Sequence, residues 1–185
     1  MKKEIYIVFD VESDGPIPGE YSMLSMGAVA LDADGVELGT FYVNLQLLPQ
    51  AKQDPDTMTW WAGNQSAWDL TRLDQQDPSV AMKNFVDWVQ SFAGVPVAVA
   101  SPAGYDWTFL YWYLIKFAGT SPFSFSCLDM KTLAMALIKT TYRKSTKRNW
   151  PRQWHSPLPH THHGLDDAQE QAYSFIQMLK HMKSL

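Results

Sequence analysis

Between Lys3 and Val11 the chain reads KEIYIVFDV, a run rich in β-branched and aromatic residues that predicts a strand buried on both faces. Such a strand should exclude ionised groups, yet Asp10 lies within it and Glu12 follows two residues later. Side chains two positions apart on a strand point to the same face. Like charges there are costly unless a cation or hydrogen-bond donors compensate. The pair therefore predicts either a bound hard divalent cation or a strand end that has reached solvent.

The rest of the chain predicts an α/β fold with a mixed β-sheet flanked by helices. Strands over Met23–Leu31 and Val36–Leu45, joined by a turn at 32–35, form an antiparallel hairpin. A strand over Pro96–Ala100 follows a helical crossover and is expected to be parallel to its neighbour. The other expected elements are helices over 56–68, 78–92, 106–118, 128–138 and 166–182, and an extended piece over 123–127. No repeat or linker interrupts residues 1–185, which predicts a single domain.

Composition narrows the class of protein. With 46% hydrophobic residues, a chain of 185 residues can bury a sizeable core, which excludes general disorder. The one cysteine, Cys127, allows no internal disulfide, as is common in a reducing compartment. The N-terminus enters a strand-like run rather than a secretory signal, and no apolar stretch reaches membrane-spanning length. We therefore expect a cytoplasmic protein that does not contact a membrane.

The net charge of −4 conceals an uneven distribution of charged residues. Residues 139–163 contain six of the 15 basic residues and no acidic one, so 9 basic and 19 acidic residues remain elsewhere. We call residues 139–163 the basic segment. A basic segment on an acidic body favours a polyanionic partner on one side and a metal site on the other, although a solvated loop also explains the charge.

Two further groups of residues place carboxylates at predicted helix starts. Asp106 follows a Pro/Gly loop, and Asp167 opens the last helix five residues after His162. A capping or first-turn role explains an isolated Asp at such a position, and we assign that role to Asp166. We expect Asp106 and Asp167 instead to face the cleft that contains the first carboxylate pair, with His162 on the loop that enters the helix.

The three groups match, in order, the motifs FDVES at 9–13, GYDWTFL at 104–110 and HHGLDDA at 162–168. This ordered set resembles the DEDDh family of 3′-to-5′ exonucleases, which includes ribonuclease T, oligoribonuclease and the proofreading subunit of bacterial replicative polymerase. Many relatives have His-Asn before the second motif, whereas this chain has Ser101 and Pro102, so a substrate contact by that Asn is absent. The altered motif and the Trp60-Trp61 pair are more similar to a phage and bacterial ribonuclease T-like branch, which includes exoribonucleases.

The resemblance implies a ribonuclease H-like fold and hydrolysis of phosphodiester bonds with two Mg²⁺ or Mn²⁺ ions, about 4 Å apart. Asp10 would bridge both ions, and Glu12 and Asp167 would hold the ion that activates water. Asp106 would help to hold the second ion, through water. His162 would accept the proton of that water, a role that suits a neutral imidazole near pH 7.

The resemblance also implies that the loop after Glu12 holds the 3′-terminal nucleotide of single-stranded RNA or DNA. Backbone groups of Ser13 and Asp14 would meet the 3′ hydroxyl. The basic segment would follow the phosphates and close over the site. Further candidate contacts to the substrate are aromatic or apolar side chains near the last bases and one cation of the basic segment: Met23, Trp61, Tyr105 and Arg148. Core packing is the competing explanation for each aromatic residue.

Two other functions compete with this interpretation. A zinc hydrolase would use His160, His162 and His163, but it leaves the carboxylate pair of the first strand unexplained. A nucleic-acid-binding module that keeps the fold without catalysis would not need all five candidate active-site residues. The sequence leaves open whether His162 or His163 is the base, and whether RNA or DNA is the substrate. Since several relatives are dimers, a homodimer also stays open.

Overall fold

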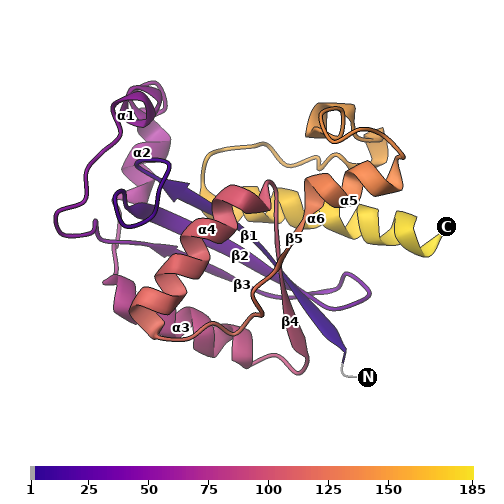
Figure 1. Ribbon diagram of the computed structural model, residues 1–185, viewed down its shortest axis with the longest axis horizontal. Helices are drawn as coiled ribbons and strands as arrows, with labels where there is room; N and C mark the ends of the chain where they lie inside the picture. Colours follow the sequence, from indigo (N-terminus) through magenta and orange to yellow (C-terminus); the bar gives the residue numbers. More distant parts are fainter. Residues whose placement is uncertain (1–2) are drawn as a thin grey trace.

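The computed structural model describes residues 3–185 and has the expected mixed sheet (Figure 1). Within those residues the sheet has five strands, in the order β3-β2-β1-β4-β5. They are β1 (Glu4–Ser13), β2 (Met23–Leu31), β3 (Glu37–Asn44), β4 (Val95–Ala100) and β5 (Cys127–Asp129). The central strand β1 pairs antiparallel with β2 and parallel with β4. The hairpin and the parallel crossover predicted from the sequence are therefore confirmed.

Helices cover both faces of this sheet. The α-helices are α1 (Pro55–Ala62), α2 (Gln65–Thr71), α3 (Pro78–Gln90), α4 (Ala103–Tyr113), α5 (Met130–Leu137) and α6 (Gly164–Lys183). A π-helical turn at Leu114–Ala118 extends α4, and the basic segment contains short 3₁₀ turns at Lys147–Asn149 and Arg152–Trp154. None of the helices in the described part of the chain combines the length and apolar composition that spanning a bilayer requires.

Three boundaries differ from the sequence-based expectation. The helix expected over 56–68 is two helices, because the backbone leaves α1 at Gly63 and re-enters a helix after Asn64. The helix expected over 128–138 begins only at Met130, since Cys127–Asp129 pairs with β4 as the edge strand. The side chain of Asp129 then caps α5 by accepting a hydrogen bond from the Thr132 backbone N–H at 2.7 Å. The fourth helix begins at Ala103, so Asp106 lies in its first turn.

The alternation along β1 separates two cores. Its odd-numbered side chains, such as Phe9 and Val11, pack with α3 and α4. On the other face, Val8 packs with α5 and α6 in the second core. Asp10 and Glu12 continue the face of Val8, because strand side chains alternate with a period of two. The apolar face covered by α6 thus changes to carboxylates where β1 reaches its C-terminal end.

The start of α6 lies directly on β2. Gly27 is the register partner of Asp10 across the β1–β2 pair. A Cβ atom on Gly27 would lie 2.3 Å from the carbonyl carbon of Gly164, and one on Gly164 would lie 2.9 Å from the backbone nitrogen of Gly27. Such separations are well below van der Waals contact, so both positions require glycine for this approach. The paired glycines bring the first turn of α6 next to Asp10.

We predict that Gly27→Ala lowers the free energy of unfolding by about 2–4 kcal/mol, because the new methyl group must push α6 away from the sheet. Urea denaturation followed by circular dichroism measures the change. Gly104→Ala is the matched control, since a Cβ at Gly104 meets no atom within 4 Å. If the two alanine variants are equally stable, the backbone contact does not limit the packing of α6.

Candidate active site

Three carboxylates meet at the C-terminal end of β1. One oxygen atom each from Asp10, Glu12 and Asp167 lies within 4.8 Å of the other two. Asp10 and Glu12 come from the same face of β1, and Asp167 comes from the first turn of α6. Asp10 Oδ1 accepts a hydrogen bond of 2.7 Å from Nε2 of Gln171, one turn further along α6. The paired carboxylates of the sequence therefore do not simply extend into solvent.

Asp106 joins the cluster from the opposite side of the sheet. The pairing of β1 with β4 ends at Val8, so β4 does not bond the backbone N–H of Val11. Asp106 Oδ1 accepts a hydrogen bond from that N–H at 3.1 Å. The residue is 4% exposed, although Asp usually lies on the surface. The first turn of α4 thus holds a fourth carboxylate against the end of β1.

Asp167 is fixed by the segment that precedes α6. Its Oδ1 accepts a hydrogen bond of 3.0 Å from the Thr161 backbone N–H and lies 3.0 Å from Nδ1 of His160. Its Oδ2 is buried without a hydrogen-bond partner among the described residues, although the side chain is only 1% exposed. Asp166, by contrast, accepts a hydrogen bond from the Thr161 hydroxyl and lies outside the cluster. An unsatisfied buried carboxylate oxygen is the kind of atom that a cation would complete.

Burial and mutual repulsion strongly perturb these acids. Burial, then the charges of Asp167 and Asp106, raises the pKa of Glu12 to about 8. Burial raises the pKa of Asp106 to about 7, although the hydrogen bond from the Val11 N–H lowers it in part. The pKa of Asp10 also lies well above its usual range, because of burial and the neighbouring carboxylates. Ionising Asp10, Glu12 and Asp106 together is therefore costly unless a positive charge is added.

The composition of the cluster suits a hard divalent cation. Asp10, Glu12, Asp106 and Asp167 offer only carboxylate oxygens, which Mg²⁺ and Mn²⁺ prefer over nitrogen and sulfur ligands. Oδ2 of Asp167 is without a partner among the described residues, and a bound cation would favour the charged forms of Asp10, Glu12 and Asp106. The residues present therefore fit the divalent-metal dependence that is typical of this kind of site.

The three neighbouring histidines have different environments. His162 lies on the loop before α6, with its ring 4.7 Å from that of Trp60 in an edge-to-face arrangement. Burial, with the charge of His160, lowers the pKa of His162, which keeps the imidazole neutral near pH 7. Hydrogen bonding to Asp167 and Glu170 raises the pKa of His160 to about 9. His163 stacks on Tyr42 at 4.3 Å and is not grouped with the carboxylates.

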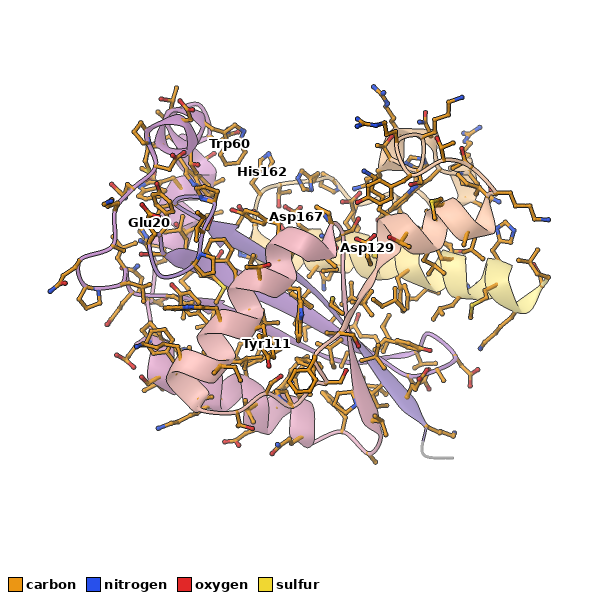
Figure 2. The ribbon with its side chains drawn as sticks, in the orientation of Figure 1. Glu20, Trp60, Tyr111, Asp129, His162 and Asp167 are labelled. Atoms are coloured by element: carbon orange, nitrogen blue, oxygen red, sulfur yellow. The ribbon has the colours of Figure 1, made fainter. Side chains whose placement is uncertain are left out.

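Figure 2 shows Trp60 and His162 directed toward each other above the labelled side chain of Asp167. His160, His162 and Asp167 also bring one ligand atom each within 4.8 Å of one another. The zinc alternative named His163 as the third ligand, but that imidazole lies against Tyr42 instead. His160, His162 and His163 therefore do not come together as the zinc alternative required.

Two of the expected substrate contacts are wrong, because the side chains lie in the core. Met23 is 0% exposed and Trp61 is 1% exposed, so neither presents a surface to a nucleobase. Trp61 instead donates a hydrogen bond from Nε1 to the Ser13 carbonyl at 2.9 Å. Trp60, its neighbour on α1, is 42% exposed and faces the site.

The loop after Glu12 is held by its own hydrogen bonds. Asp14 accepts a bond from the Ser22 N–H through its side chain, and its backbone N–H and carbonyl bond to Ser22 and Asp54. Asp14 therefore supports the loop, and its backbone N–H, which was expected to meet a 3′ hydroxyl, is already bonded to Ser22. Ser13 Oγ lies 2.5 Å from the Tyr105 hydroxyl, and Tyr105 is 38% exposed. Ser13 and Tyr105 thus form one polar group at the edge of the site.

The structure adds residues that the sequence analysis did not select. Gln171 bonds Asp10, and Glu170 bonds the Lys147 ammonium. Both residues follow Asp167 by about one helical turn, so their spacing is a signal that could have identified the same face of α6. For Trp60, the sequence signal was the Trp-Trp pair, but nothing in the pair indicates which of the two rings is buried.

A model of the Rv2179c-like 3′-5′ exoribonuclease domain matches residues 6–179. The chain belongs to this family of 3′-5′ exonucleases. A relative in Escherichia coli, the 3′-5′ DNA exonuclease Cap18, is 28% identical over 190 residues, which cover 99% of this chain and 97% of Cap18. The sequence-based assignment to 3′-to-5′ exonucleases is therefore confirmed.

Solved structures share the fold of this family member at low sequence identity. A 3′-exonuclease described in 3′-end recognition of a histone mRNA stem-loop has a TM-score of 0.72 at 13% identity, covering 97% of this chain and 83% of the other. The nuclease domain of 3′hExo, a DEDDh family member bound to rAMP, has a TM-score of 0.63 at 15% identity. The match covers 97% of this chain and 92% of that domain. The expected ribonuclease H-like fold is thus confirmed.

We predict that Glu12→Gln stabilises the metal-free exonuclease at pH 8. The folded-state pKa of about 8 lies above the ordinary value of 4.5, so the folded protein retains a proton that the unfolded chain releases between those pH values. Stability is therefore lost as the pH rises through this window, and removing the charge should restore about 2–4 kcal/mol at pH 8 and less at pH 5.5.

Urea denaturation in EDTA at the two pH values tests this expectation. Glu20→Gln serves as a control, because the Glu20 carboxylate is 43% exposed and pairs with Lys52 on the surface. A Glu12→Gln variant that is less stable than the parent at pH 8 would show that the charge of Glu12 does not oppose folding.

Proposed function

We propose that the protein is a metal-dependent 3′-to-5′ exonuclease that hydrolyses single-stranded RNA or DNA and releases nucleoside 5′-monophosphates. The observation that supports this most strongly is the convergence of Asp10, Glu12, Asp106 and Asp167 at one end of β1, with His162 beside them. Membership in the exonuclease family supports the direction of cleavage. A module that only binds nucleic acid would have no use for three acids, Asp10, Glu12 and Asp106, whose burial raises their pKa values and opposes folding.

The four acids would hold two Mg²⁺ or Mn²⁺ ions. Asp10 lies between Gln171 and the other carboxylates, which suits a ligand shared by both ions. Glu12 and Asp167 would complete one ion site, and Asp106 would contribute to the other. When bound, the ions lower the pKa of water and stabilise the attacking and leaving oxygens of an in-line displacement. In their charged forms the four carboxylates would keep these ions fixed during the reaction.

His162 is the proposed general base. Its lowered pKa keeps the imidazole unprotonated near neutral pH, so it can accept the proton of the attacking water. His162 adopts a left-handed backbone conformation with φ of 57°, and its ring rests on the edge of Trp60. The loop before α6 thus presents the imidazole at the rim of the site, where substrate binding can move it toward the reacting phosphate.

The 3′-terminal nucleotide is proposed to lie between β1 and α1. The Ser13–Tyr105 pair would face its sugar, and the exposed ring of Trp60 would offer a stacking surface that tolerates any base. Arg148, which is exposed in the basic segment, would contribute to phosphate attraction. The family description refers to RNA and the Cap18 description to DNA, so both polymers belong in the test.

We predict that 5′-labelled single-stranded RNA or DNA shortens in single-nucleotide steps with Mg²⁺ or Mn²⁺ and stays intact in EDTA. A 3′-blocked strand should survive and a 5′-blocked strand should not. Asp10→Asn should reduce turnover roughly 10³-fold or more, because the shared cation ligand loses its charge. Asp34→Asn is the matched control on the exposed β2–β3 turn. Survival of the strand that is blocked only at its 5′ end would contradict the polarity, and an intact but tightly bound strand would favour a non-catalytic module.

We predict that His162→Ala lowers kcat roughly 10²–10⁴-fold, the usual contribution of a general base. His163→Ala should leave kcat within about threefold, since its ring stacks on Tyr42 outside the cluster. Single-turnover kinetics at saturating Mg²⁺ measure both variants. A large loss in His163→Ala together with a small loss in His162→Ala would reassign the base.

A further inference from the structure

A cavity of about 360 Å³ opens beside Asp10, on the side of the site that faces α5 and the basic segment. The polar residues that line it include Asp10, Ser101, Lys147, His160, Glu170 and Gln171. Neither Ser13 nor Tyr105 is among the lining residues. The cavity is therefore separate from the Ser13–Tyr105 pair, and Asp10 lies between the two.

The position of the cavity relative to the scissile bond follows from the proposed function, on which this inference rests. Figure 1 shows α1 on one side of the C-terminal end of β1, and α5 with the basic segment on the other. With the terminal nucleotide on the α1 side, we place the remaining strand on the α5 side. The phosphates that precede the scissile one then pass over the cavity.

Lys147 is the one lysine or arginine of the basic segment among the residues that line the cavity in the described chain, and His160 of the same segment lies 3.6 Å from Glu170 there. Its ammonium forms a short ion pair with the carboxylate of Glu170 on α6. Glu170 is 5% exposed, whereas the Lys147 side chain is 43% exposed. An ammonium has three N–H donors, so the pair fixes the position of the lysine while further donors face solvent. Fixing the side chain in advance reduces the entropy lost when a ligand binds.

Glu170 also prevents a competing contact. Asp10 lines the same cavity, so a lysine free to move there would be attracted to that carboxylate instead of to an external anion. Glu170 holds the ammonium on the neighbouring turn of α6, and Nε2 of Gln171 occupies the near oxygen of Asp10. The ammonium is thereby kept available for an external anion.

We propose that Lys147 binds the phosphate immediately 5′ of the scissile phosphate, and that Glu170 is the positioning residue that holds the Lys147 ammonium at the cavity. The ligand is a phosphodiester monoanion of the strand that stays after cleavage. Arg148 lies on the same 3₁₀ turn but does not line the cavity, so its contribution to binding should be general and not specific to one phosphate.

The test neutralises one phosphate at a time. Oligonucleotides of eight residues carry a single methylphosphonate at the second or the third linkage from the 3′ end. We expect the parent protein to lose about tenfold in kcat/KM with the second linkage neutralised, as for a lost charged hydrogen bond. Lys147→Ala should have a kcat/KM about tenfold lower than the parent on the unmodified strand. Neutralising the second linkage should lower the kcat/KM of this variant no further. Lys147→Arg should restore the loss of kcat/KM caused by the methylphosphonate at the second linkage, and Arg148→Ala should show that loss in full.

Glu170→Gln separates positioning from folding. It should weaken binding and reduce the methylphosphonate effect while Lys147 is still present, whereas lost stability alone would leave that effect unchanged. Lys147→Ala should also lower the slope of log affinity against log salt by about 0.7, the value for one phosphate contact on a single strand. Urea denaturation checks that each variant is folded.

The same oligonucleotides, measured by fluorescence anisotropy with Ca²⁺ in place of Mg²⁺, report the contact without turnover. One outcome is that the parent releases no nucleotide while its binding, measured by anisotropy, still weakens when the second linkage is neutralised and that effect is lost in Lys147→Ala. In that case the proposed function fails and the phosphate contact stands. If Lys147→Ala keeps the full methylphosphonate effect, or if only the third linkage is sensitive in the parent, the assignment of Lys147 to this phosphate is overturned.

Discussion

The carboxylate cluster depends on how closely the start of α6 approaches β2. Because Gly27 and Gly164 lack side chains, the backbone of the helix lies against the strand at the position that pairs with Asp10. One turn later, Asp167 reaches the carboxylates of β1. A wider separation would fill the space with apolar side chains and leave Asp10 without its neighbours. The two glycines thus bring Asp167 of α6 next to the two carboxylates of β1.

That geometry opposes folding in the absence of a cation. Burial raises the pKa values of Asp10, Glu12 and Asp106, and repulsion adds to the shift at Asp10 and Glu12, so ionising these acids at neutral pH lowers the stability of the fold. Hydrogen bonds from Gln171 and the Val11 N–H offset part of this cost. They orient single oxygens and leave others available. The surrounding core, which is apolar on both faces of β1, supplies the stability that keeps the cluster assembled.

The parts of this molecule that were predictable from the sequence are those governed by regular periods. The alternation along β1 placed Asp10 and Glu12 on one face, and the mixed sheet followed from the order of strands and helices. Which of Trp60 and Trp61 is exposed was not predictable, because a short helix between loops takes its orientation from tertiary contacts. Met23 was misjudged for a related reason, since it begins a strand whose residues are buried on both faces.

The basic segment illustrates a further limit of charge patterns. Its six cations predicted a polyanion partner, but a count of charges does not distinguish a residue that attracts the substrate from one that contacts a particular phosphate. The distinction comes from α6, where Glu170 lies one turn after Asp167 and pairs with Lys147. On the proposed function, the same helix would carry an acid for a metal ion and an acid that positions a lysine for the substrate. Because both acids belong to one helix, the spacing between the proposed metal site and the proposed phosphate contact would be set by the helix and not by the irregular segment.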